Sequence, residues 1–585
     1  MKTYSKLFRE FGIVIASAVL ISAFVSLTLT PMLNAKLFRK SQKKSKFYIK
    51  TEPFFEALEN GYRKSLEAFL RVRLWAVGIW VATIVACWGL LGVLQSELAP
   101  LDDRSAMRLS ITAPEGASYG YTDDFMLKLG RFVMDSVPEN KIVLTVTAPG
   151  FTGSGAVNTG FVRLMLTEPG DRERSQQQIA DYLSKKAKGF TEARVFALQE
   201  QTISAGGGAA RSGFPVQFVI QAPSFDKLKE KLPKFMEEAG KNPVFQGLDV
   251  NLKFNKPEFT IVPDRDKAKS LGVSVADIAQ TLQLSFSGQR ISYFTMNNKQ
   301  YQVISQLDYK DRSKPLDLKS LYVRNNVGQL IQVDNLVKTE ENSSPPQLYH
   351  YNRYTSATVS AGLAPGKTVG DGIAEMEKIS KVVLDDSFST TLTGASRDYA
   401  ESSSNILFAF GLALILIYLL LAAQFESFMD PVIIILFTAT PALAGALFSL
   451  WYFNQTLNIF SQIGIIMLIG LVTKNGILIV EFINQLRERG TQRHDAIVQG
   501  SVLRLRPILM TSLATALGAL PIALALGAGS TSRMSMGIVV IGGLIFSVAL
   551  TLYIVPAFYS MFYSFMDWVK GYFSRSQKNA FENEI

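Results

Sequence analysis

Seven apolar stretches dominate the sequence, and each is long enough to cross a membrane as a helix. About 20 apolar residues in helical form span the roughly 30 Å of hydrocarbon in a bilayer. In lipid, backbone polar groups must be satisfied within the protein, which favours a helix for each span. The stretches are residues 12–33, 74–94, 404–423, 431–453, 458–483, 507–527 and 536–562. The sequence therefore predicts a membrane protein with a long polar region between its second and third spans.

The net charge of +11 is a topology signal rather than a sign of nucleic-acid binding. Residues 34–73 contain eleven Lys or Arg against four Glu, and such basic loops stay in the cytoplasm. This predicts a basic cytoplasmic loop at 34–73, a second Arg-rich loop at 484–506 and a cytoplasmic tail at 563–585. Residues 95–403 then lie on the outer side. An odd number of spans leaves Met1 outside despite three basic residues before the first span, so we expect the natural polypeptide to begin further upstream.

The outer region alternates short strands with helices in a repeated order. Residues 95–212 read as strand, helix, strand, strand, helix, strand, the ferredoxin-like βαββαβ unit. The same order starts again in 213–255 and is completed in 343–403, with residues 256–342 inserted between the two parts. The expected fold class is an α+β membrane protein. It has one span in 1–33, a second at 74–94, five in 404–562, and two ferredoxin-like units of which the second is split.

One lysine lies near the middle of the fifth apolar stretch. Placing a cation there costs on the order of 3 kcal/mol, so such residues usually have an anionic partner and mark an ion path. No apolar stretch of this chain offers a buried Asp or Glu to Lys474. Glu481 is two turns further along, about 10 Å at a rise of 1.5 Å per residue. The sequence therefore predicts that the counter-ion of Lys474 comes from protein outside this chain.

Other patterns carry less information. The glycine-rich segments 149–155 and 204–209 are either mobile loops over a cavity or plain surface loops. Residues 361–368 fit a relaxed nucleotide-binding loop, but no later apolar strand ends in the Asp that would hold magnesium, so we interpret them as a turn before a helix. A single cysteine and two histidines give no disulfide framework and no His-based metal site. No nucleophile–base or metal constellation indicates an enzyme.

Two motifs carry a resemblance to a known family. Residues 470–482 read GLVTKNGILIVEF and residues 504–512 read RLRPILMTS. Supporting motifs are SLTLTP at 26–31, NTG at 158–160, GVS at 272–274 and APGKT at 364–368. With them, nearly the whole chain resembles the C-terminal half of a resistance–nodulation–division (RND) efflux permease of the hydrophobe/multidrug exporter type. The resemblance implies a multi-pass protein of the bacterial inner membrane that exports drugs or other amphiphilic compounds from the periplasm or the membrane. The resemblance further implies that a proton gradient drives this export and that no cofactor takes part.

The resemblance also implies roles for parts and partners. The units 95–212 and 213–255 with 343–403 would be periplasmic porter subdomains, and residues 256–342 a docking subdomain. The expected partners are two further copies in a homotrimer, an N-terminal half, a periplasmic adaptor protein and an outer-membrane channel. Because the family has twelve spans and an aspartate pair on its N-terminal half, we expect this chain to need that half for transport.

Particular residues receive roles in the same way. Lys474 matches the lysine that pairs with the two aspartates, and Asn475, Arg504 and Thr511 would belong to the same proton relay. Arg504 could equally anchor the interface, and Thr511 could serve helix packing. The substrate pocket and its switch loop would include Gly150, Phe151, Gly153, Gly155, Phe196, Leu198 and Asn251. Phe196 and Leu198 could instead be core residues. Asp249 stands where multidrug members often have an arginine, which leaves the substrate range open.

Two other functions remain as alternatives. One is a half-permease that does not transport but binds ligands or assembles with a partner. The other is a heavy-metal RND exporter, for which Met126, Met134 and Met165 would be candidate ligands. Methionines usually fill cores, which argues against the metal exporter.

Overall fold

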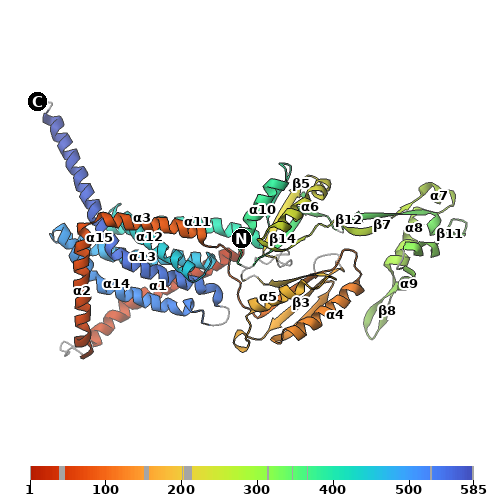
Figure 1. Cartoon of the computed structure of the whole chain (residues 1–585), viewed down its shortest axis with the longest axis horizontal. Helices are drawn as coiled ribbons and strands as arrows, with labels where there is room; N and C mark the ends of the chain where they lie inside the picture. The colour runs from red at the N-terminus through yellow and green to blue at the C-terminus, as the bar shows by residue number, and fades with distance from the viewer. Residues whose placement is uncertain are drawn as a thin grey trace. The chain divides into compact units, whose positions relative to one another are not determined.

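The computed structural model describes residues 2–37, 46–149, 157–200, 202, 214–312, 315–345, 347–364, 366–526 and 530–582. They form two compact units (Figure 1). The first combines Met1–Asn251 with Tyr349–Ile585, and the second is Leu252–Leu348. The second unit falls where the sequence suggests an insertion at 256–342.

Seven helices of the described chain are long and apolar enough to cross a membrane, the number expected from the sequence. The candidate spans lie in α1 (Lys2–Leu37), α3 (Leu74–Val93), α11 (Gly394–Phe425), α12 (Asp430–Tyr452), α13 (Ile459–Glu488), α14 (Arg493–Ala523) and α15 (Thr531–Glu582).

Both basic segments expected as loops are largely helical. Residues 34–73 contain α2 (Lys46–Arg71), and α13 and α14 leave only residues 489–492 of the loop expected at 484–506. Hydropathy marks only the part of a helix that lies in hydrocarbon. Leu, Gln, Glu and Arg are good helix formers, so the helices continue beyond their apolar stretches.

Small residues bring α12, α13 and α15 together. A Cβ atom on Gly542 of α15 would lie 1.7 Å from the Ser449 hydroxyl oxygen of α12. A Cβ atom on Gly543 would lie 2.2 Å from the Leu468 side chain of α13. Small residues allow such close approach of helices in membranes. The positions next to these glycines are filled by a core cluster that includes Ala442, Ala446, Leu468, Val472 and Val539.

The first sheet follows the order predicted from the sequence. Its elements are β1 (Ala106–Thr112), α4 (Tyr119–Ser136), β2 (Asn140–Thr147), β3 (Thr159–Leu166), α5 (Gln176–Ala187) and β4 (Arg194–Gln199). The strands are antiparallel in the order β2-β3-β1-β4. Burial alternates along β1, so Met107, Leu109 and Ile111 point into a core shared with residues of α4 and α5.

The second sheet repeats this topology with a break. Its elements are β5 (Val216–Ala222), α6 (Phe225–Lys241), β6 (Phe245–Val250), β13 (Tyr349–Tyr351), β14 (Tyr354–Leu363), α10 (Val369–Val383) and β15 (Ser389–Leu392). The order is β13-β14-β5-β15, and β6 also pairs with β14. Every residue of β5 is buried, and the chain leaves for the second unit after β6.

The second unit contains three strands that the sequence analysis missed. They are β7 (Lys256–Pro263), β8 (Gln289–Met296) and β12 (Val337–Ser344). The others are β9 (Lys299–Ser305), β10 (Tyr322–Arg324) and β11 (Leu330–Gln332), with α7 (Arg265–Ser270), α8 (Val275–Leu282) and α9 (Tyr309–Arg312). Most of β7 and β8 is exposed on both faces, so these strands lack the alternation of apolar and polar residues that marks a half-buried strand.

Candidate functional site

Helix α13 presents Lys474 on its one open face. Asn458 caps this helix by accepting hydrogen bonds from the backbone N–H groups of Phe460 (3.0 Å) and Ser461 (3.1 Å). Between Ile459 and Val480, all of which the structure describes, only Gly470 and Lys474 are exposed. They lie four residues apart, so both occupy the same face of the helix.

Lys474 makes no ion pair and no hydrogen bond with any other described residue. Its neighbour Asn475 is 2 % exposed and its side-chain nitrogen lies 3.5 Å from the Ser512 hydroxyl oxygen of α14. The two residues therefore point to different sides of α13. Asn475 contributes to helix packing, whereas Lys474 is exposed.

The two other candidate relay residues lie on α14 and have local partners. The guanidinium of Arg504 lies 4.4 Å from the ring centroid of Phe482 on α13, a distance at which the ring attracts the cation. The Thr511 hydroxyl donates to the backbone carbonyl of Ile508, 3.2 Å away in the same helix. Among the described residues, no continuous hydrogen-bonded path joins Arg504 and Thr511 to Lys474.

The structure places one buried acid, Asp430, just before the apolar stretch expected at 431–453. This residue begins α12 and is 2 % exposed. Its carboxylate accepts hydrogen bonds from the Asn484 amide (3.1 Å) and the Tyr563 hydroxyl (2.9 Å). The apolar stretch in the sequence starts at residue 431, so Asp430 was not counted as part of this span. Asn484 lies ten residues after Lys474 on α13, about 15 Å along the axis, so Asp430 is no direct partner of the lysine.

The network around Asp430 joins three helices. The Arg487 guanidinium donates to the Tyr559 hydroxyl, 2.9 Å away, and lies 4.5 Å from the ring centroid of Tyr563. The Tyr559 hydroxyl donates in turn to Asn484. Because its polar groups have partners within the chain, the cluster holds α12, α13 and α15 together.

Helix α2 crosses one end of the bundle helices (Figure 1). Arg506 of α14 forms ion pairs with Glu59 and, at 3.3 Å, with Glu52 of α2. Tyr62 is buried and its hydroxyl donates to the backbone carbonyl of Leu552 in α15. Residues 46–71 of the basic segment between the first two spans thus form an amphipathic helix attached to the bundle, rather than a loop.

Two of the candidate pocket residues line a cavity of about 580 Å³. Phe196 and Leu198 lie on β4, an edge strand of the first sheet. Phe214, just before β5, packs edge-on against Phe196 with ring centroids 5.0 Å apart. Gly247 of β6 has a φ of +81°, and a Cβ atom there would lie 2.6 Å from the Phe196 ring. Because both the conformation and the space favour glycine, Gly247 lets the two sheets approach at this ring.

Of the remaining predicted pocket residues, the structure describes Asn251 alone. Asn251 does not line it, since its side chain and backbone both bond to the backbone of Thr358 in β14 (2.7 and 3.2 Å). Gly150, Phe151, Gly153 and Gly155 lie outside the described residues. Of the methionines considered as metal ligands, Met126 is 1 % exposed in the core of the first sheet, while Met134 and Met165 are exposed.

Comparison with models of protein families identifies the family of the chain. A model described as the AcrB/AcrD/AcrF family matches residues 2–563. The chain belongs to this family of RND permeases. The resemblance deduced from residues 470–482 and 504–512 is therefore confirmed at the level of the family.

The curated relatives of this chain are named as a transporter or as multidrug resistance proteins. An uncharacterized transporter of Haemophilus influenzae is 30 % identical over 562 residues, which are 95 % of this chain and 53 % of the relative. Multidrug resistance protein MdtC of Proteus mirabilis is 30 % identical over 560 residues, 95 % of this chain and 54 % of MdtC. MdtC of an Escherichia coli O81 strain is 29 % identical over 582 residues, which are 98 % of this chain and 55 % of that MdtC. The chain thus spans about half the length of the curated relatives it matches.

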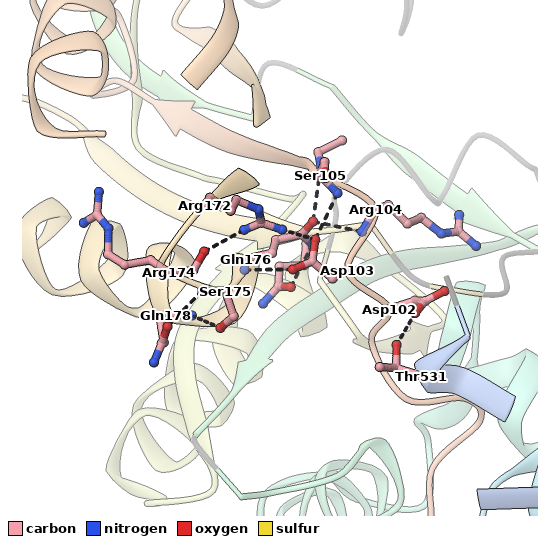
Figure 2. Close-up of polar contacts among 12 residues, drawn as sticks. Asp102, Asp103, Arg104, Ser105, Arg172, Arg174, Ser175, Gln176, Gln178 and Thr531 are labelled. Atoms are coloured by element: carbon pink, nitrogen blue, oxygen red, sulfur yellow. Dashed lines mark hydrogen bonds and ion pairs between the residues drawn. The ribbon is translucent and has the colours of Figure 1, made fainter. Parts of the chain in front are cut away.

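In this permease chain, a polar junction links the first sheet to α15 (Figure 2). Asp103 pairs with Arg172, whose side chain is 1 % exposed, and accepts hydrogen bonds from the backbone N–H groups of Ser105 and Gln176, each 3.1 Å away. The preceding Asp102 is 5 % exposed and accepts a hydrogen bond from the Thr531 hydroxyl at the start of α15. Sequence reasoning missed this junction because its partners lie far apart in the chain.

Proposed function

We propose that this permease chain is the C-terminal portion of a proton-driven efflux transporter that exports drugs or other amphiphilic compounds. The observation that carries the proposal is Lys474, a cation within a membrane-length helix that has no partner among the described residues. Intramembrane charges of this kind usually pair with an opposite charge and take part in ion movement. The names of the MdtC relatives support a drug as cargo.

A second half of the transporter would supply the counter-ion. Paired carboxylates facing the Gly470–Lys474 side of α13 would attract the ammonium strongly, because interactions between charges are strong in a medium of low dielectric. Protonation of one carboxylate weakens that attraction and releases the lysine. Such a charge change can drive a bistable arrangement of helices. Asn475, Arg504 and Thr511 would adjust the packing of α13 against α14 during this step.

The cavity around Phe196 would receive the cargo. Its aromatic and aliphatic wall suits an amphiphilic molecule, since ligand pockets are mostly apolar with a few placed polar groups. The contact of Asp102 with Thr531 would transmit movement of α15 to the first sheet. In a Gram-negative inner membrane the complex would be a homotrimer with a periplasmic adaptor and an outer-membrane channel, and the strand-containing units would lie in the periplasm.

Transport by reconstituted protein tests the proposal. The chain is placed in proteoliposomes with a pH gradient, alone and together with the polypeptide that supplies the N-terminal half, and dye efflux is followed by fluorescence. We expect no efflux from the chain alone and efflux from the pair. Lys474→Ala in the pair should reduce the rate at least about a hundredfold, as expected for loss of an essential proton-transfer group.

Two controls make the result specific. Arg489→Ala removes an exposed cation after α13 and should leave efflux unchanged, whereas Lys474→Arg keeps the charge and should preserve assembly of the pair. Normal efflux by the Lys474→Ala pair would contradict the proton-relay role. If the assembled pair does not transport at all, a ligand-binding or assembly module becomes the better description.

A further inference from the structure

The cavity near Phe196 contains one carboxylate that differs from its other charged groups. Four side chains that ordinarily carry charge line it: Glu97, Asp181, Lys188 and Lys367. Asp181, Lys188 and Lys367 are exposed, whereas Glu97 is half-buried. The rim charges are therefore solvated, and Glu97 is the charge closest to the interior of the protein.

Glu97 is fixed by the loop that precedes α13. The Thr456 hydroxyl donates to its carboxylate at 2.6 Å, and its backbone N–H donates to the carbonyl of Leu457 at 3.2 Å. The next residues, Leu98 and Ala99, pack in a cluster with Ile459 and Phe460 of α13. Among the described residues, Glu97 has Thr456 as its side-chain donor and no cation as a partner. A half-buried carboxylate without a cation thus borders an apolar cavity at the membrane helices.

The wall beside this carboxylate is aromatic. Phe196 and Phe214 are in edge-to-face contact, and both line the cavity with Glu97. Aromatic faces attract organic cations, and a carboxylate adds an opposite charge. The combination suits a molecule with a hydrophobic body and a delocalised positive charge. It does not suit an anion of the same shape, which the carboxylate would repel.

We propose that Glu97 is a specificity-determining residue that makes the cavity prefer amphiphilic organic cations, with Phe196 and Phe214 holding the hydrophobic body. This inference rests on the proposed function, because it assigns a substrate class to the same cavity. It adds a residue that no family motif in the sequence singles out. Burial raises the pKa of the Glu97 carboxyl, and the hydrogen bond from Thr456 partly opposes that effect.

Binding of two ions of equal shape and opposite charge tests the inference. Tetraphenylphosphonium and tetraphenylborate are titrated calorimetrically into the purified chain in phosphatidylcholine nanodiscs, with empty nanodiscs subtracted. Glu97→Gln keeps the size and an acceptor for Thr456. We expect it to weaken tetraphenylphosphonium binding about fivefold, equivalent to about 1 kcal/mol for one partly solvated charge pair. Tetraphenylborate binding should not weaken.

Two further variants separate the inference from the proposed function. Asp181→Asn removes a rim carboxylate and should change the affinity for neither ion. Phe196→Ala should weaken the binding of both ions. Suppose that Phe196→Ala weakens the binding of both ions, while Glu97→Gln changes neither affinity or changes both equally. Charge selection by Glu97 is then overturned, and the cavity remains a binding site. If Phe196→Ala affects neither ion, both the inference and the cargo site of the proposed function fail.

A pH series on the unaltered chain provides a measurement that needs no variant. The charge of tetraphenylphosphonium is fixed, so its affinity should fall as acidification protonates Glu97 through its raised pKa. The other titratable groups near this carboxylate are Asp181, Lys188 and Lys367, which are exposed at the rim, and Tyr399, whose hydroxyl donates to Ser96 beside Glu97. An affinity that is constant between pH 7.5 and the acid limit of stability would overturn the inference.

Discussion

The two faces of α13 differ in how completely their groups are satisfied. Away from the open face, on two different sides of the helix, Asn475 contacts Ser512 and Asn484 binds the Asp430 carboxylate. The open face carries Gly470 and Lys474, and the Lys474 ammonium has no polar partner in the described part of the chain. A charge in apolar surroundings is costly unless it is paired. The difference therefore separates positions that hold this bundle together from positions available to protein outside it.

The largest effect is expected where the buried face is most polar. Asp430→Ala removes the acceptor of Asn484 and Tyr563 and leaves two half-buried donors unsatisfied. Each unsatisfied group costs about 1 to 3 kcal/mol, so we expect a total loss of about 2 to 6 kcal/mol. The free energy of unfolding is measured by titration with SDS in mixed micelles, followed by circular dichroism.

An exposed acidic residue of the same helix bundle provides the control for Asp430. Glu488 ends α13 and is exposed, and Glu488→Ala should change the unfolding free energy by no more than about 0.5 kcal/mol. Equal losses for the two variants would mean that the buried cluster does not stabilise the bundle, and the contrast between the faces would fail at its strongest point.

Substitution of two glycines of α13 tests the difference between its buried and open faces, and we expect changes in stability of intermediate size. A Cβ atom on Gly476 would lie 2.7 Å from the Thr438 side chain, whereas one on Gly470 would meet nothing within 4 Å. Gly476→Ala should cost about 1 to 2 kcal/mol through overpacking. Gly470→Ala should stabilise the chain by about 0.5 to 1 kcal/mol, because alanine is the better helix former. Opposite signs in the same SDS titration support the two-face model, and equal signs contradict it.

The sequence predicted the elements whose side chains alternate between core and solvent. In β1 the buried residues Met107, Leu109 and Ile111 alternate with partly exposed ones, and both βαββαβ successions could be followed by this period. The strand β8 could not, since seven of its eight positions are exposed. The helical ends of α13 and α14 were also missed, because hydropathy does not distinguish a polar helix from a polar loop.

The candidate site could be predicted from the sequence where a charged residue lies within an apolar stretch. Lys474 stands out in any hydropathy profile, whereas Asp430 lies at the border of an apolar stretch and escapes notice. Glu97 carries no local signal at all. Its environment depends on Thr456, which is 359 positions away in the sequence, and on a cavity formed by strands of two sheets. Contacts of this kind depend on tertiary structure that no local pattern contains.

The smallest effect on stability is expected at the residue on which the function depends most. Lys474→Met replaces an exposed ammonium that has no partner among the described residues, so the unfolding free energy of this chain alone should change by no more than about 0.5 kcal/mol. A loss as large as that of Asp430→Ala would mean that the ammonium already has a stabilising partner within this chain. The open face of α13 would then belong to the fold itself, and no second half would be needed to explain the lysine.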